Sequence, residues 1–353
     1  MIEYQLKQKD PGPATFDMSL SMLRIVFMGT PEFAVASLNA LVTAGYSVVG
    51  VVTAPDKPAG RGMKITESAV KKYAVKKGLH VLQPEKLKDP VFLEELKSLQ
   101  ADVQIVVAFR MLPEVVWNMP RMGTINLHGS LLPQYRGAAP INWAVINGDK
   151  ETGVTTFKLK HEIDTGDILL QESFSIGDDE TAGEVHDRMM EIGAQLLVKT
   201  MKGLVDGSLK ETPQEAPDSY RDGSQQPTAI DTQPESTHSP LAIHHSPLRH
   251  APKIFTTTCN IDWTKGNEEI YNLIRGLSPY PAAFTELVDK TLKIYRSEKE
   301  WVIPTSKPGQ WESDGKTYLK FACKDGYIHV KDIQLEGKKR MLVEDFLRGY
   351  HFK

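Results

Sequence analysis

The chain is poor in cysteine and has no long apolar run. Its two cysteines, Cys259 and Cys323, are far apart among 353 residues and form neither a CxxC metal pattern nor a disulfide framework. This usage is typical of a reducing compartment. Apolar runs such as 48–52 are much shorter than the ~20 residues that cross a bilayer. Residues 1–21 carry acids and prolines but no apolar segment, so we interpret them as a disordered tail and not a signal peptide. We expect a cytoplasmic protein without a membrane anchor.

A strong excess of positive charge is also missing. The net charge is −3, and the contents of 41% hydrophobic and 25% charged residues are ordinary for a globular chain. Residues 286–353 hold 14 Lys and Arg against 11 Asp and Glu, a net charge of +3, so the remainder carries −6. A protein that is basic throughout is therefore excluded, and any contact with nucleic acid must be local.

Residues 22–211 alternate between strand and helix patterns. Short apolar runs favour buried strands, and the segments between them have helical spacing. Thr181 and Glu184 form a plausible capping box before the last of these helices. Repeated β-α-β units predict an α/β domain with a doubly wound, mostly parallel sheet. We expect strands at 23–29, 47–54, 80–84 and 102–109, and helices at 31–45, 67–78, 92–100 and 181–204.

The composition changes after residue 211. Residues 212–252 are rich in Pro, Ser, Thr, Gln and His and predict a low-complexity linker or insertion with no packed element. Its histidines could hold a metal, but no other ligand type stands at a fixed spacing, and we favour plain low complexity. Residues 253–353 follow with a helix at 267–277 and short strands separated by Asp-Gly turns, which predicts a small, OB-like β-barrel domain. The linker histidines are His238, His244, His245 and His250.

The stretch INLHGSLLPQYRGAAP (125–140) begins as a buried strand but contains two polar residues. Asn126 and His128 are two residues apart, so they share one face of the strand at its carboxyl end, where α/β sheets bind ligands. In HEIDTGDILLQE, Asp164 is the better candidate to meet His128, and we interpret Asp167 as a turn residue. An amide, an imidazole and a carboxylate favour acyl-type transfer: Asn126 and the imidazolium stabilise an oxyanion, and the Asp–His pair relays a proton.

Other chemistries have weaker support in the sequence. A zinc site would also use His and Asp, but no HExxH, CxxC or third spaced ligand is present. LRIVFMGTPEF has one glycine where a dinucleotide fingerprint needs three. No Ser or Cys stands in a recognisable nucleophile motif. We expect no metal.

These motifs, together with VVTAPDKPAGRGMK, VVAFRMLP and a C-terminal module ending DIQLEGKKRMLVEDFLRG, resemble the methionyl-tRNA formyltransferase family. The resemblance covers residues 23–353 apart from the linker. The central motif is shared by other enzymes that use 10-formyltetrahydrofolate. The resemblance implies transfer of a formyl group from 10-formyltetrahydrofolate, as co-substrate, to the methionine amine of initiator tRNA. It places Asn126, His128 and Asp164 on the family's catalytic trio.

The resemblance also implies binding residues. The folate-binding turn falls on Ser130, Leu131, Leu132 and Pro133, and contacts to the pterin ring fall on Phe109, Arg110, Met111 and Leu112. The glycine-rich loop with Lys57, Arg61 and Lys64 is implied to enter the acceptor end of the tRNA, with Arg61 in the leading role; by itself it could equally be a solvated turn. The basic run Lys338, Lys339 and Arg340 could lie along the tRNA backbone or be ordinary surface charge.

Three alternatives stay open from the residues alone. A formyltransferase acting on a sugar-nucleotide or purine-precursor amine would share the trio, and so would a hydrolase that releases formate from the donor. A folate-binding or RNA-binding protein without catalysis is the third. We expect initiator methionyl-tRNA and formyl-folate as partners, no membrane, and a monomer.

Overall fold

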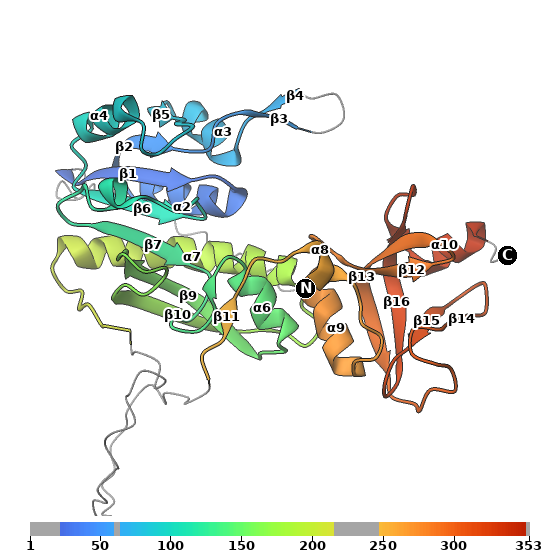
Figure 1. The fold of residues 1–353 in the computed structure, drawn as a ribbon. Helices are drawn as coiled ribbons and strands as arrows, with labels where there is room; N and C mark the ends of the chain where they lie inside the picture. Colours follow the sequence, from blue (N-terminus) through green and yellow to red (C-terminus); the bar gives the residue numbers. More distant parts are fainter. Residues whose placement is uncertain (1–21, 60–63, 215–246, 351–353) are drawn as a thin grey trace, which may run out of the picture. The chain divides into compact units, whose positions relative to one another are not determined.

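The computed structural model describes residues 22–59, 64–214 and 247–350 (Figure 1). The predicted N-terminal tail, Arg61 and most of the predicted linker lie outside these residues. Contacts between Cα atoms divide the chain into two compact units. The first is Met1–Ile125 with Leu197–Leu209, and the second is Asn126–Leu196 with Lys210–Lys353.

The first unit is built on parallel strands with fully buried central residues. They lie in the order β5-β2-β1-β6, and Ile25 to Met28 of β1 are 0% exposed because both faces of the sheet are covered. Asp89 caps α4, since its carboxylate accepts from the amides of Val91 and Phe92. The strands are β1 (Arg24–Gly29), β2 (Ser47–Val52), β5 (Val81–Leu82) and β6 (Val103–Val107), with a hairpin of β3 (Lys57–Ala59) and β4 (Lys64–Thr66); the helices are α2 (Glu32–Thr43), α3 (Ala69–Lys76), α4 (Pro90–Ser98) and α5 (Glu114–Trp117).

The second unit begins with the strands that carry the polar motif. Its strand order is β7-β9-β10, and β10 is antiparallel to β9. The predicted capping box is confirmed: the Glu184 carboxylate accepts from the Thr181 amide at 2.9 Å, and the Glu184 amide donates to the Thr181 hydroxyl. The elements are β7 (Thr124–His128), β8 (Arg136–Gly137), α6 (Pro140–Ile146), β9 (Glu151–Lys158), β10 (Ile168–Ser175), α7 (Ala182–Val205) and β11 (His250–Ala251). The division between the units falls within β7, after Ile125, and within α7, after Leu196.

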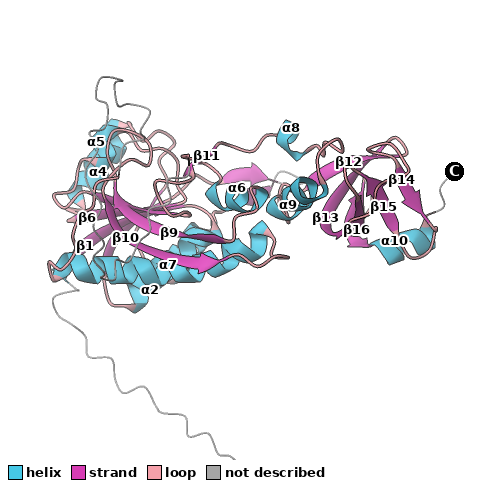
Figure 2. Ribbon diagram, turned by 90° about the horizontal axis from the view of Figure 1, so that it is seen from below, coloured by secondary structure: helices cyan, strands magenta, loops and turns pink. Residues whose placement is uncertain are grey.

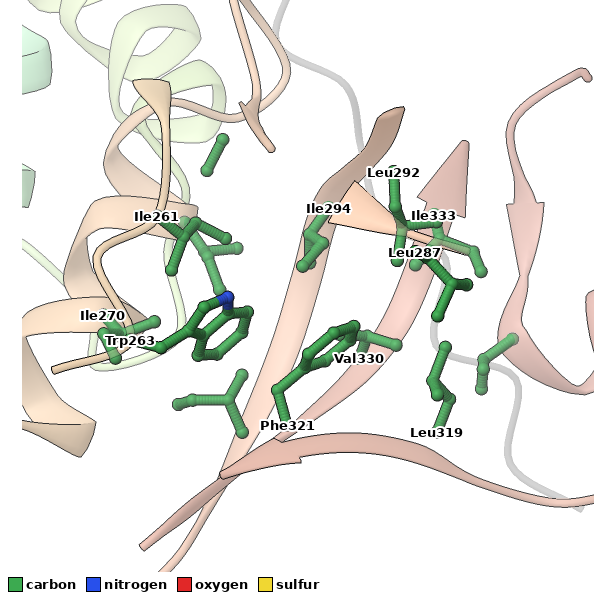
Figure 3. Packing of buried hydrophobic residues seen from close by; sticks show 14 of the residues in the cluster. Ile261, Trp263, Ile270, Leu287, Leu292, Ile294, Leu319, Phe321, Val330 and Ile333 are labelled. Carbon is green, nitrogen blue, oxygen red and sulfur yellow. The ribbon is translucent and has the colours of Figure 1, made fainter. Parts of the chain in front are cut away.

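The rest of the second unit is a six-stranded antiparallel half-barrel. Trp263 stacks on Phe321 inside it, with ring centroids 4.7 Å apart, among the aliphatic side chains of the strands (Figure 3). Helix α9 lies against both α6 and β13 (Figure 2). The strands are β12 (Ala283–Leu287), β13 (Lys290–Glu300), β14 (Trp311–Ser313), β15 (Leu319–Ala322), β16 (Tyr327–Leu335) and β17 (Met341–Leu342); the helices are α8 (Thr256–Cys259), α9 (Asn267–Gly276) and α10 (Val343–Gly349).

The predicted fold class is confirmed: a mostly parallel α/β sheet and a small antiparallel β module. Several predicted elements are one to three residues too long at an end, because flanking residues with suitable propensity lack ladder or helix hydrogen bonds.

The described ends of the predicted linker differ from expectation, because they pack against other parts of the chain. Thr212 pairs with Ile168, and β11 pairs with β8. The domain boundaries themselves stay a prediction. Among the described helices, none has the length and hydropathy of a membrane span.

Candidate active site

Strand β7 presents its polar side chains on one face. Ile125 and Leu127 are buried at 0% and 3% exposure on the opposite face, while Asn126 is half-buried and His128 is 7% exposed. This is the alternation that the sequence predicted. The side chain of Asn126 has no hydrogen-bond partner among the described residues, so its amide N–H groups are available to a ligand.

The imidazole of His128 is held by the loop that follows it. Its Nε2 lies 2.9 Å from the carbonyl oxygen of Tyr135, and Phe157 packs edge-on to the ring. A carbonyl oxygen can only accept, so Nε2 carries a hydrogen and donates it. Nδ1 is therefore the ring nitrogen left for chemistry in the neutral ring.

Asp164 faces this nitrogen. Its Oδ2 lies 3.9 Å from His128 Nδ1 and accepts a 3.0 Å hydrogen bond from the amide of Gly137. The backbone of Asp164 has a φ of +54°, a strained conformation that proteins tend to keep at functional sites. The structure thus brings His128 and Asp164 together. Asp167 instead forms an ion pair with Lys160 at 2.7 Å.

Polar side chains of β9 and β10 hold the turn from Ser130 to Pro133. The hydroxyl of Thr155 donates to the Ser130 carbonyl at 2.7 Å and accepts from the Leu132 amide at 3.1 Å. Gln171 donates to the Leu132 carbonyl at 2.9 Å. Sequence reasoning missed Thr155, a buried hydroxyl on β9, and Gln171, an exposed amide on β10, because their partners lie more than 15 positions away in the chain.

The four residues predicted to contact the pterin ring follow β6 in the first unit. Ala108 has a φ of +46°, so the chain turns sharply at the end of the strand. Leu112 is buried, whereas Met111 is 74% exposed. Arg110 donates to the backbone carbonyls of Pro84 and Glu85, and partial burial lowers the pKa of its guanidinium. Its side chain is therefore engaged in holding the loop.

The predicted basic residues differ in their availability. Lys57 is exposed on β3, and Lys64 begins β4. Lys338 and Lys339 are exposed. Arg340 is not free, because its guanidinium forms a two-pronged ion pair with Asp332 and lies over the ring of Tyr295.

Other residues that sequence reasoning missed stand around the His–Asp pair. Tyr135 is 5% exposed, and its hydroxyl donates to Asp149 at 2.6 Å. Burial, reinforced by the Asp149 hydrogen bond, raises the pKa of this hydroxyl, so it remains a donor at neutral pH. Gln214 and Arg249 bond to the same loops. No three His, Cys, Asp or Glu side chains gather as a metal site within the described ranges.

Comparison with known proteins identifies the class. A family model described as formyl transferase matches residues 23–201, and the model of its C-terminal domain matches 253–351. The chain belongs to the formyl transferase family, which confirms the resemblance seen in the sequence.

Some relatives share more than half of their residues with this chain. Proteins named methionyl-tRNA formyltransferase from Parabacteroides distasonis and Phocaeicola vulgatus are 55% and 56% identical over 334 residues, which cover 93% of this chain and 96% of each relative. Among solved structures, an N-formyltransferase from Helicobacter canadensis, in complex with folinic acid and dTDP-3-aminofucose, matches with a TM-score of 0.61 at 19% identity. The match covers 88% of this chain and 99% of that one, and it shows likeness of fold.

Proposed function

We propose that this chain transfers the formyl group of 10-formyltetrahydrofolate to the α-amino group of methionine on initiator methionyl-tRNA. The observation that carries the chemistry is the approach of Asp164 to His128 Nδ1 at the carboxyl end of β7. The acceptor rests on the name of relatives that match this chain over nearly its whole length. A sugar or purine-precursor amine, or water, is less favoured as acceptor, since those relatives bear the tRNA enzyme's name.

The proton leaving the attacking amine goes to His128. The neutral amine attacks the formyl carbon and must lose one proton as the new C–N bond forms. Because Nε2 already donates to Tyr135, the lone pair of Nδ1 accepts this proton. Asp164 stabilises the resulting imidazolium from 3.9 Å away. The same proton then passes to N10 of the folate as its bond to the formyl carbon breaks.

The oxyanion of the tetrahedral intermediate is stabilised by Asn126. The amide lies two residues before His128 on the same strand face and has no competing partner among the described residues. A donor that is already in place gains most when negative charge develops on the carbonyl oxygen. This role refines the expectation that the imidazolium shares the oxyanion, because its Nε2 hydrogen points to the Tyr135 carbonyl.

The folate donor is proposed to contact the turn Ser130, Leu131, Leu132 and Pro133 and the segment Phe109, Arg110, Met111 and Leu112. Support for the turn comes from Thr155 and Gln171, which hold its backbone in one conformation. Support for the segment comes from exposed Met111, an apolar surface that a flat ring can cover.

The tRNA is proposed to contact Lys57, Arg61 and Lys64 in one loop and Lys338 and Lys339 in the half-barrel. Exposure of Lys57, Lys338 and Lys339 supports phosphate contacts. Arg340 is proposed to act mainly by supporting this surface, because Asp332 already neutralises it. We further propose that the protein works as a monomer in the cytoplasm, where translation begins.

The test is an assay with donor labelled in the formyl group and with purified charged tRNAs. Label should appear on initiator methionyl-tRNA and far less on an elongator. Label on a small amine, or release of formate without any acceptor, would contradict the proposal in favour of one of the alternatives.

A further inference from the structure

Two chain segments that flank residues 215–246 pack on the loops of the His–Asp pair. We call residues 129–139 the histidine loop and residues 159–167 the aspartate loop. One flanking segment ends at Gln214, and the other begins at residue 247. Both belong to the same compact unit as the two loops.

The side chain of Gln214 joins the two loops. Its Nε2 donates to the carbonyls of Asp164 and Gly166 at 2.9 and 2.8 Å, and its Oε1 accepts from the guanidinium of Arg136. The backbone nearby is fixed by two hydrogen bonds between Thr212 and Ile168. A left-handed Asp is strained and persists only when its surroundings hold it. The hydrogen bond from Gln214 Nε2 to the Asp164 carbonyl helps to hold Asp164 in this conformation.

Arg249 holds the residue that binds the imidazole. Its carbonyl accepts from the amide of Tyr135 at 2.7 Å, and its guanidinium donates to the Tyr135 hydroxyl and to Asp149. Tyr135 has a φ of +59° and is therefore also in a conformation that needs support. The Tyr135 carbonyl accepts the hydrogen bond from His128 Nε2. Arg249 therefore influences the imidazole through Tyr135, the residue that both of them contact.

Strand β11, directly after Arg249, completes the contact. It pairs with β8, and the carbonyl of Ala251 accepts from the amide of Ala138 at 2.7 Å. A Cβ on Gly137 would lie 2.5 Å from that carbonyl oxygen, so glycine is needed for this approach. The amide of Gly137 then faces Asp164.

We propose that Gln214 and Arg249 are positioning residues that set the separation between His128 Nδ1 and Asp164 Oδ2. Gln214 ties the aspartate loop to the histidine loop, and Arg249 fixes the carbonyl against which the imidazole is aligned. The turnover test rests on the proposed function, whereas the geometry can be tested without it.

The first test separates kcat from KM. Gln214→Ala and Arg249→Met should lower kcat by ~10–100-fold, since misplacement of reacting groups by about 1 Å costs on the order of 10²-fold. The KM values for donor and tRNA should change little. Arg249→Lys should recover part of kcat, whereas Gln214→Glu should not, because it replaces the donor to two carbonyls by an acceptor. Unchanged kcat, or a rise in KM alone, would overturn the proposal.

Arg296→Met is the matched control. Arg296 pairs with Glu184 and its side chain is 46% exposed, against 45% for Arg249, but it touches neither loop. Its kcat should equal that of the unaltered protein. An equal decrease in kcat in both arginine variants would show a general effect of losing an ion pair and would contradict the positioning role of Arg249.

A double-mutant cycle asks whether Gln214 acts through Asp164. In an Asp164→Asn background, Gln214→Ala should lower the residual kcat by no more than about twofold, because groups that act as a unit are not additive. The same ~10–100-fold fall in both backgrounds would mean that Gln214 acts independently of Asp164, and it would overturn the positioning role.

Amide hydrogen exchange measures the geometry itself. The Gly137 amide, protected by Asp164, should exchange at least ten times faster in Gln214→Ala than in the unaltered protein, a ratio that corresponds to about 1.4 kcal/mol. Retained protection overturns the positioning role. If instead the unaltered protein transferred no formyl group, the proposed function would fail while the exchange result stood.

Discussion

At the scale of the residue, the site depends on which atoms are already engaged. His128 uses Nε2 for a carbonyl and leaves Nδ1 opposite a carboxylate, while Asn126 has an amide with no described partner. In the proposed mechanism these two side chains have separate tasks on one strand face, and Asp164 supports His128 from a different loop. Which atoms of these side chains can react depends on the hydrogen bonds that their neighbours make, and not on residue type alone.

Removing the proton acceptor should abolish turnover while the fold survives. His128→Ala and Asp164→Asn should each lower kcat by ~10²–10⁴-fold, since general acid–base catalysis contributes that much. Steady-state formylation of initiator methionyl-tRNA and the thermal unfolding midpoint are the measurements. His80→Ala is the control, because His80 makes a comparable contact with Glu95, at 3.2 Å, on an exposed surface. Near-full turnover in either site variant would refute the mechanism.

Removing the oxyanion donor should affect rate more than binding. Asn126→Ala should reduce kcat by ~10²–10³-fold with a nearly unchanged KM for the folate, because the amide contributes only once the carbonyl oxygen becomes negative. A change confined to KM would instead assign Asn126 to ground-state binding.

At the scale of the element, the docking of α9 on α6 joins the half-barrel to the strands of the site. Gly276 ends α9 where a Cβ would lie 2.5 Å from Ile146 Cγ1 and 2.8 Å from its amide nitrogen. Asn142 donates to the Gly276 carbonyl at 2.7 Å. The two helices can approach this closely because the residue between them has no side chain.

Gly276→Ala should destabilise the second unit. Overpacking costs about 1–3 kcal/mol, which outweighs the gain of roughly 0.5–1 kcal/mol from replacing a helical glycine. The midpoint of thermal unfolding should fall. Gly349→Ala is the matched control, since Gly349 also ends a helix but has open space around its Cβ position. A midpoint that falls equally in both variants would rule out the close approach as the cause.

At the scale of the whole molecule, charge is unevenly shared. Residues 286–353 carry +3 in a chain of −3 overall. A net charge this small gives weak, salt-sensitive attraction to a polyanion, so affinity for tRNA must come from local groups. We propose Lys338 and Lys339, which are exposed, as such groups, whereas Arg340 is neutralised by Asp332.

The combined change Lys338→Ala and Lys339→Ala should weaken tRNA binding and leave the KM for the folate unchanged. The slope of log affinity against log salt should become shallower by about one per lysine. The control removes the same charge elsewhere on the half-barrel, with Lys290→Ala and Lys316→Ala, both exposed. Equal slopes for the two double variants would mean that only net charge matters.

Much of this site was predictable because its signals are local. Strand periodicity placed Asn126 and His128 on one face, and an Asp before a tight turn singled out Asp164. The partners of Arg110 and Arg340 were not predictable. Arg110 bonds to backbone carbonyls and Arg340 to a carboxylate, and in both cases the fold brings the partner near. The roles of Gln214 and Arg249 were not predictable either, because their partners are distant in the chain and their own segment has the composition of a linker.

The sequence by itself determined the order of strands and helices, the polar face of β7 and the family, since these follow from residue spacing over a few positions and from shared motifs. Only the tertiary structure decided which nitrogen of His128 is free, how near Asp164 comes, and what holds both loops. Those properties arise from hydrogen bonds between residues up to 115 positions apart, such as Arg249 with Gln134, and chain folding alone creates such pairs.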